Sequence, residues 1–263
     1  MPRDILVAIL EDDVFSSNWM ALLMVRDWRT RLVGEFQTRA DFYKFLKQRK
    51  RSFDVLILDV DLIGDRVRIS EICQRLEDEE HNAKILLTGI LPELRILNQI
   101  QDPRIRGYVT KHEVGYSLSW IITFIEKGYF VFTPSTLKAA SNSQFVIPDH
   151  KLIVKGKKDL PGFTDHESEV ARMAFIFSLG RRDMADELKI TEQWSYSMVS
   201  ELYKKMGLGD ILMGEVDLFS YIPESRIIRE HFNEIIGQIG QSTKARDMET
   251  LAYHMITMPE ILA

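Results

Sequence analysis

The stretch from Phe53 to Leu62 constrains the fold more than any other part of this chain. It is a short run of Val, Leu and Ile that ends in two carboxylates, Asp59 and Asp61. A run without polar alternation is typical of a strand that is buried on both faces of a parallel sheet. Open α/β sheets bind their ligands beyond the carboxyl ends of the strands. Asp59 is therefore predicted to lie at the edge of the sheet where a ligand binds.

The first half of the chain alternates between apolar segments and segments with helical periodicity. This alternation predicts an α/β domain over residues 1–130, in which five parallel strands form a doubly wound sheet with right-handed crossovers. Besides the Asp59 strand, the predicted strands are 5–10, 32–36, 83–88 and 107–111, and the predicted helices are 16–28, 40–50, 67–78, 92–101 and 117–127.

Polar side chains follow four of the five predicted strands. Glu11 and Asp12 follow the first strand, Thr88 ends the fourth and Lys111 ends the fifth. Clustered carboxylates repel one another unless a cation joins them, and hard oxygen ligands of this kind suit Mg²⁺. A carboxylate beside such a metal can act as a nucleophile towards a phosphoryl group, whose charge Lys111 and the Thr88 hydroxyl can compensate. The next acid, Asp13, is predicted to cap the first helix.

With these motifs in this order, residues 4–130 resemble the receiver domain of bacterial two-component response regulators. The resemblance implies that Asp59 accepts a phosphoryl group from the phosphohistidine of a histidine kinase. It also implies that Glu11, Asp12 and Asp59 bind Mg²⁺ and that the backbone carbonyl of Asp61 completes the protein ligands.

The same resemblance implies a switch. Lys111 and Thr88 would contact the phosphoryl group, and Tyr108, three residues before Lys111, matches the switch aromatic of the family. Thr88 would shift towards the new phosphate and Tyr108 would follow it inward. This movement would change the face built by the fourth and fifth strands.

An enzyme is the alternative interpretation of the same stretch. Asp59-Val60-Asp61 also resembles the nucleophile motif of haloacid-dehalogenase-type phosphatases. Those proteins place the motif near the N-terminus and an acidic pair downstream. Here the acidic pair comes first and no second pair follows Lys111 at the end of a strand. We therefore expect a phosphorylated switch and not an enzyme.

Residues 131–161 have the composition of a linker, with several Pro, Ser, Asn and Gly residues. Two short segments within them, 144–147 and 152–154, allow short strands or an ordered lead-in to a second domain.

Residues 162–210 change to short helical segments. Thr164 is predicted to cap a first helix, with acidic residues in its first turn. A short helix over 183–188, a tight turn, a cap at Thr191 and a longer helix over 192–206 follow. This order predicts a helix-turn-helix domain.

The helix-turn-helix segment resembles the DNA-binding domain of the LuxR/NarL/FixJ class. The matching residues include Thr164, Glu167, the Ile190-Thr191-Glu192-Gln193 segment and the Lys204–Leu208 segment. The resemblance implies that the helix beginning at Thr191 enters the major groove and that the protein regulates transcription. The candidate DNA contacts are Arg181, Arg182, Gln193, Tyr196, Ser197, Lys204 and Lys205.

The predicted base-reading face departs from that class, because Tyr196 and Met198 stand where the family commonly has lysine and histidine. The chain as a whole has a net charge of −5, and acids offset the cations of this domain. Since phosphate neutralisation supplies most non-specific affinity, we expect weak DNA binding. The alternative is a degenerate helix-turn-helix whose output is protein binding.

The chain continues past the usual end of that class. Residues 211–221, 225–237 and 245–257 have helical periodicity and predict a helical extension over 211–263 that packs on the helix-turn-helix or dimerises. Its strongest apolar stripe consists of Ile227, Ile228, Phe232, Ile235 and Ile236. Residues 255–263 are predicted to be mobile, and we expect a homodimer that binds a two-fold symmetric DNA site.

The remaining composition points to an ordinary globular protein. No apolar run approaches the roughly 20 residues that span a membrane, and the N-terminus lacks a signal-peptide pattern. Cys73 is the single cysteine, so no intramolecular disulfide can form. These features predict a cytoplasmic protein.

Overall fold

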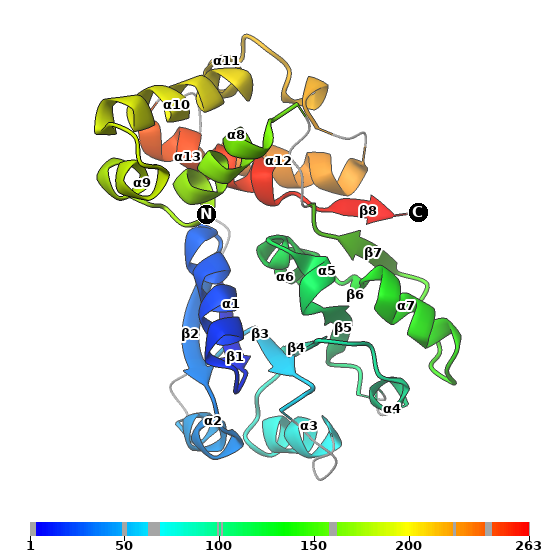
Figure 1. Cartoon of the computed structure of the whole chain (residues 1–263). Coiled ribbons are helices and arrows are strands. Elements are labelled where there is room, and N and C mark those ends of the chain that lie inside the picture. Colours follow the sequence, from blue (N-terminus) through cyan, green and yellow to red (C-terminus); the bar gives the residue numbers. More distant parts are fainter. Residues whose placement is uncertain are drawn as a thin grey trace. The chain divides into compact units, whose positions relative to one another are not determined.

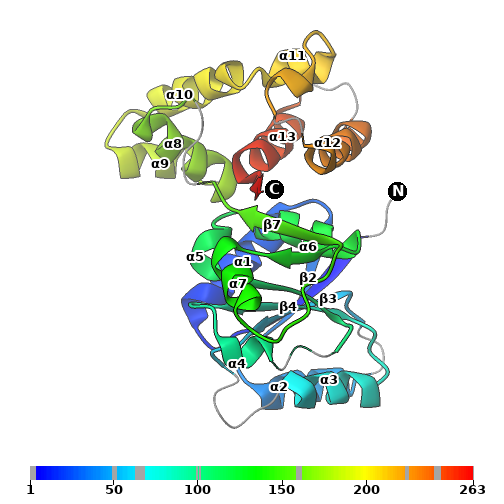
Figure 2. The same cartoon turned by 90° about the vertical axis from the view of Figure 1, so that its right-hand side faces the viewer.

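The computed structural model describes residues 4–48, 52–62, 69–98, 100, 102–157, 162–222, 225–239 and 244–262. The chain divides into two compact units. The first consists of Met1–Gly156 together with Pro259–Ala263, and the second of Lys157–Met258. Figures 1 and 2 show the elements of both units. Among the described residues, no helix is long and apolar enough to cross a bilayer.

The first unit contains an eight-stranded sheet with the strand order β2-β1-β3-β4-β5-β6-β7-β8. All neighbouring strands are parallel except β7 and β8, which are antiparallel. The predicted parallel sheet is therefore present, but its predicted size of five strands is wrong, because three more strands continue it beyond β5. The strands are β1 (Ile5–Leu10), β2 (Thr30–Phe36), β3 (Val55–Asp59), β4 (Lys84–Gly89), β5 (Ile105–Thr110), β6 (Phe130–Phe132), β7 (Lys151–Lys155) and β8 (Glu260–Leu262).

Helices cover both faces of this sheet. On one face, α1 (Val14–Arg26) packs against α6 (Leu118–Glu126). The apolar core of the other face joins alternate residues of the strands to α2 (Arg39–Leu46), α3 (Ile69–Asp78), α4 (Leu94–Leu97) and α7 (Pro134–Ser141). Successive residues of a strand point to opposite faces of the sheet, so a sheet that is covered on both faces buries apolar side chains on both.

Two local details decide how the helices near the sheet edge begin and end. Asp13 caps α1 as predicted, because its Oδ2 accepts a hydrogen bond from the Ser16 N–H at 2.8 Å. Of the helix predicted over 92–101, whose positions 99 and 101 lie outside the described residues, the structure has the four residues of α4, which begins after an extended Glu93.

Residues 131–155 of the range predicted to be a linker contribute two strands and a helix to the first unit, and positions 158–161 lie outside the described residues. Phe130 and Phe132 are buried, and β6 pairs with β5. Thr133 and Pro134 then begin α7, with Thr133 in a capping box and proline in the first turn. Proline favours the first position of a helix. Its presence here therefore marks a helix start, although composition alone suggested a linker.

The second unit is helical, as predicted. Thr164 and Glu167 form a capping box at its first helix. The last helix, α13, packs against η1 and α11, and the apolar stripe of α12 lies in the core with Phe232 fully buried. Its elements are α8 (Asp165–Ala171), the π-helix η1 (Arg172–Ile176), α9 (Arg181–Leu188), α10 (Glu192–Lys205), α11 (Leu208–Met213), the short η2 (Leu218–Ser220), α12 (Arg226–Ile239) and α13 (Ala245–Thr257).

The end of the chain returns to the sheet of the first unit. Residues 260–262 pair with β7 as strand β8, with Ile261 opposite Val154 (Figure 1). The interpretation of residues 211–263 as wholly helical is therefore wrong at its C-terminal end. A three-residue strand has no periodic pattern of its own, so only its distant partner reveals it.

Candidate functional site

Three carboxylates meet where β1 and β3 end. Glu11 follows β1, Asp59 ends β3, and both are buried with 0% and 1% of their surface exposed. Asp12 is exposed beside them. One oxygen from each of the three carboxylates lies within 4.8 Å of the other two. The cluster forms because β1 and β3 are parallel neighbours, so their carboxyl ends lie at the same edge.

Lys111 supplies the positive charge for the two buried acids. It is the first residue of the short helix α5 (Lys111–Val114), which follows β5. Its Nζ lies 2.7 Å from Glu11 Oε2 and 3.2 Å from Asp59 Oδ1. Neither of these buried oxygens accepts a hydrogen bond of regular geometry. The ammonium group is therefore their counter-charge.

The protonation of these groups reflects that arrangement. Burial raises the pKa of Glu11 to about 7, although Lys111 acts against the rise. Burial also raises the pKa of Asp59, again opposed by Lys111. For Lys111, burial favours the neutral amine, but the contacts with Glu11 and Asp59 outweigh burial and raise its pKa. One ammonium does not compensate two buried carboxylates, so a hard divalent cation fits this cluster.

Thr88 lies directly beside Asp59 on the next strand. The two residues are paired in the register of β3 and β4. Thr88 is buried, and its hydroxyl donates to the Leu58 carbonyl at 3.5 Å, which is long for an O–H···O bond. Asp59 Oδ2 accepts a hydrogen bond from the Leu62 N–H at 3.0 Å. Thr88 can therefore exchange its weak partner for a group attached to Asp59.

Tyr108 and Asp61 both hold the loop that follows β4. The Tyr108 hydroxyl accepts from the Glu93 N–H at 3.0 Å and donates to the Leu91 carbonyl at 3.3 Å. Its ring is fully buried, and burial raises the pKa of Tyr108 to about 12. Tyr108 is therefore already buried in this structure, whereas the predicted inward movement would begin from an exposed side chain. The Asp61 side chain is exposed and accepts from the Ile90 N–H, outside the carboxylate cluster.

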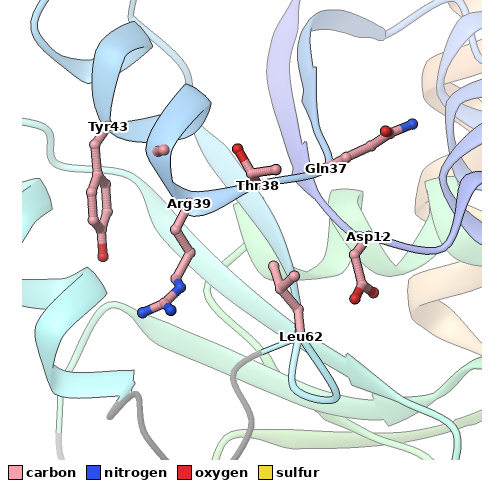
Figure 3. Close-up of a pocket in the computed structure, with 7 residues that line it drawn as sticks. Asp12, Gln37, Thr38, Arg39, Tyr43 and Leu62 are labelled. Atoms are coloured by element: carbon pink, nitrogen blue, oxygen red, sulfur yellow. The ribbon is translucent and has the colours of Figure 1, made fainter.

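A cavity of about 510 Å³ adjoins the acidic cluster. Figure 3 shows Asp12 on one side of it and the Arg39 side chain from the start of α2 on the other. Leu62, whose N–H binds Asp59, also lines it. The cavity therefore gives a small group access to the neighbourhood of Asp59.

In the second unit, α9 and α10 form the predicted helix-turn-helix. Thr191 caps α10 by accepting from the Trp194 N–H at 3.2 Å. The buried Ser195 hydroxyl donates to the Arg181 carbonyl at 2.9 Å and so joins the two helices. Gln193 and Ser197 are exposed on the first turns of α10, where base contacts were predicted. Trp194 and Tyr196 are also exposed there, at 56% and 58%.

The predicted phosphate-contacting cations differ in their surroundings. Lys204 pairs with Glu201 and Lys205 pairs with Glu167, each at 2.8 Å. The Arg181 guanidinium lies 5.9 Å from the centre of the Tyr196 ring, and Arg182 is exposed. The Lys204–Glu201 pair is exposed and therefore weak, so a phosphate can replace its carboxylate at a small cost, whereas Glu167 also accepts hydrogen bonds from Thr164.

One polar network near Lys111 was not predicted from the sequence. Glu113 accepts hydrogen bonds from the Thr110 hydroxyl at 2.8 Å and from the Ser135 hydroxyl at 2.5 Å. The Thr136 hydroxyl donates to the Tyr108 carbonyl at 2.7 Å. The only local signal for this network is the Thr133-Pro134 helix start, and the prediction of a linker concealed it.

A scan against protein-family models finds none that matches this chain. A search of curated proteins finds no match either.

Several solved structures are similar to this chain in fold. The RcsB response regulator of Salmonella typhimurium is 19% identical, with a TM-score of 0.46, over 78% of this chain and 93% of that one. A complex of the two-component response regulator RcsB with DNA is 19% identical, with a TM-score of 0.46, over 76% and 90%. The response regulator ChrA of a heme-sensing two-component system is 15% identical, with a TM-score of 0.36, over 78% and 90%.

Proposed function

We propose that this protein is a response regulator whose first unit is phosphorylated on Asp59 and whose second unit binds DNA. The observation that carries the proposal is the convergence of Glu11, Asp12, Asp59 and Lys111 at one edge of a parallel sheet. A buried carboxylate with a neighbouring ammonium and a candidate divalent-cation site suits phosphoryl transfer.

The reaction would move one phosphoryl group from a histidine kinase to this chain. An Asp59 oxygen attacks the phosphorus, the P–N bond of the phosphohistidine breaks and the imidazole leaves. Mg²⁺, held by Glu11, Asp12 and Asp59, would supply further positive charge to the phosphoryl oxygens. Lys111 would then contact these oxygens, and the Thr88 hydroxyl would turn from the Leu58 carbonyl towards them.

Covalent phosphorylation in the presence of Mg²⁺ tests whether Asp59 accepts the phosphoryl group. Acetyl phosphate should add one phosphoryl group to the full chain, detected as a mass increase, and Asp59→Asn should abolish it. Asp13→Asn is the matched control, because asparagine caps a helix as well as aspartate does. A phosphorylated Asp59→Asn protein would show that the acceptor is another residue.

The proposed output is DNA binding by α10. Between residues 181 and 205 the five Lys and Arg residues are balanced by five Asp and Glu residues. With so little net charge, we expect weak binding with a shallow dependence on salt. Two copies would bind a two-fold symmetric site as a homodimer.

Gel shifts over a series of salt concentrations test this output. Arg182→Ala should weaken binding to any DNA sequence and lower the salt slope by about 1. Lys44→Ala, an exposed cation of the first unit, should leave binding unchanged. If the full chain retains no DNA fragment even at low salt, DNA binding is not its output.

Protein binding is the second candidate output. The exposed Trp194 and Tyr196 favour it, because aromatic side chains commonly dominate protein interfaces. Trp194→Ala would then abolish binding to the partner protein, whereas Arg182→Ala would have little effect. The opposite ranking of these two variants on DNA distinguishes the outputs.

A further inference from the structure

The two chain connections to the helical unit join it to two neighbouring strands of the sheet, β7 and β8. The chain leaves the first unit after Gly156, directly following β7, and returns at Pro259 to form β8. β8 lies beside β7 (Figure 1). In the register of this antiparallel pair, Lys155 lies opposite Glu260. Any displacement of β7 therefore affects the two attachments together.

The end of β7 is bound to α5. The Gly156 N–H donates to the Glu113 carbonyl at 2.7 Å. A Cβ at position 156 would lie 2.0 Å from the Val114 carbonyl oxygen, so only glycine permits this approach. We call the contact of Gly156 with Glu113 and Val114 the β7–α5 junction.

The β7–α5 junction lies a few residues from the acidic site. Helix α5 begins with Lys111, which contacts Glu11 and Asp59. Its Glu113 carboxylate is held by the hydroxyls of Thr110 and Ser135. A short helix fixed at both ends transmits a shift of Lys111 to Gly156 because it has little freedom to absorb it.

β8 is the weaker of the two attachments. It pairs over three residues, all of them partly or well exposed, and it lies at the edge of the sheet. Short edge strands open at low free energy, and their opening is a local event that leaves the rest of the sheet intact.

We propose that α5 and β7 couple the acidic site to the helical unit, and that phosphorylation of Asp59 releases β8 from β7. The coupling rests on the proposed function, since a phosphoryl group on Asp59 would draw Lys111 away from Glu11. The shift then passes through Glu113 and Val114 to Gly156. The helical unit changes from two attachments to one.

Hydrogen exchange of the full chain with Mg²⁺, with and without beryllofluoride, tests this coupling. Beryllofluoride should slow exchange near Thr88 and speed exchange of the β7 and β8 amides by about tenfold. In Gly156→Ala the β7 and β8 amides should exchange fast without beryllofluoride, which should then have no further effect on them. Gly237→Ala is the control, because nothing lies within 4 Å of a Cβ at that position.

A second variant serves if Gly156→Ala does not fold. Removal of residues 259–263 should give fast exchange in β7 that no longer responds to beryllofluoride, while the response near Thr88 persists. A wild-type response near Thr88 without any change in β7 and β8 would overturn the coupling and leave the phosphorylation intact. The absence of any response near Thr88 would overturn both.

Discussion

At the scale of single residues, the negative charge of the acidic site is only partly compensated. Glu11 and Asp59 are both buried, and the Lys111 ammonium lies between them. A buried charge destabilises the folded state unless an opposite charge compensates it. Removal of one partner leaves the other buried without compensation.

Lys111→Met should lower the free energy of unfolding by about 3 kcal/mol in EDTA, because Glu11 and Asp59 lose their counter-charge. In Mg²⁺ the loss should be smaller, since the cation compensates the same carboxylates. Urea denaturation under both conditions measures this difference. Lys44→Met, which breaks an exposed pair with Asp41, should cost less than about 1 kcal/mol. Equal losses with and without Mg²⁺ would contradict a cation site beside Lys111.

Glu113→Gln should show a stability difference that depends on pH. Burial acts to raise the pKa of Glu113, but hydrogen bonds from Ser135, Thr133 and Thr110 outweigh burial and lower the pKa below 4.5. A carboxyl group whose pKa is lowered on folding stabilises the protein above its unfolded pKa, and this contribution is lost as the pH falls through the folded pKa.

The expected loss for Glu113→Gln is therefore about 1 kcal/mol near neutral pH, as for a hydrogen-bonded group. It should shrink progressively below pH 4.5. Urea unfolding of both proteins at several pH values measures it. A difference that grows towards acid pH would mean that Glu113 is protonated in the folded protein.

At the scale of elements, short polar motifs decide where helices begin. Thr164 and Thr191 each accept a hydrogen bond from the N–H group three residues later. At the start of α7 the Thr133 N–H instead donates to the Thr136 hydroxyl at 2.9 Å, and Pro134 follows Thr133 in the first turn. The Thr191 cap fixes where α10 begins, and Gln193 and Trp194 are exposed directly after it.

Thr191→Ala should destabilise the helical unit by about 1 kcal/mol through loss of the α10 cap. The loss should appear as faster hydrogen exchange in the first turn of α10 and as a lower melting temperature. Ser197→Ala on the same helix is the control, because its hydroxyl is exposed and bonds only within the helix. If both variants behave alike, the Thr191 hydroxyl contributes no cap.

At the scale of the whole molecule, one unit is inserted into the other. The helical unit lies between β7 and β8 in the sequence, and both strands belong to the sheet of the first unit. A ligand that binds one unit is expected to stabilise that unit directly.

Mg²⁺ at about ten times its Kd should raise the free energy of unfolding of the first unit by about 1.4 kcal/mol. Hydrogen exchange resolves the units, and protection should increase in β1, β3 and β5 more than in α10 or α12. Asp12→Asn should reduce the effect, whereas Asp13→Asn should not. Equal protection of both units would point to non-specific binding of the ion.

Local patterns in the sequence determined the β1–β5 core, the acids at its edge and the helix-turn-helix with its caps. Periodicity, strand-end carboxylates and capping residues involve positions that are close together in the chain, so the sequence alone is enough to recognise them. Only the tertiary structure decided that β6, β7 and β8 extend the sheet, that Glu113 binds Ser135, and that Lys205 pairs with Glu167. These contacts join residues far apart in the chain, and a three-residue strand such as β8 exists only because β7 offers it backbone hydrogen-bond partners.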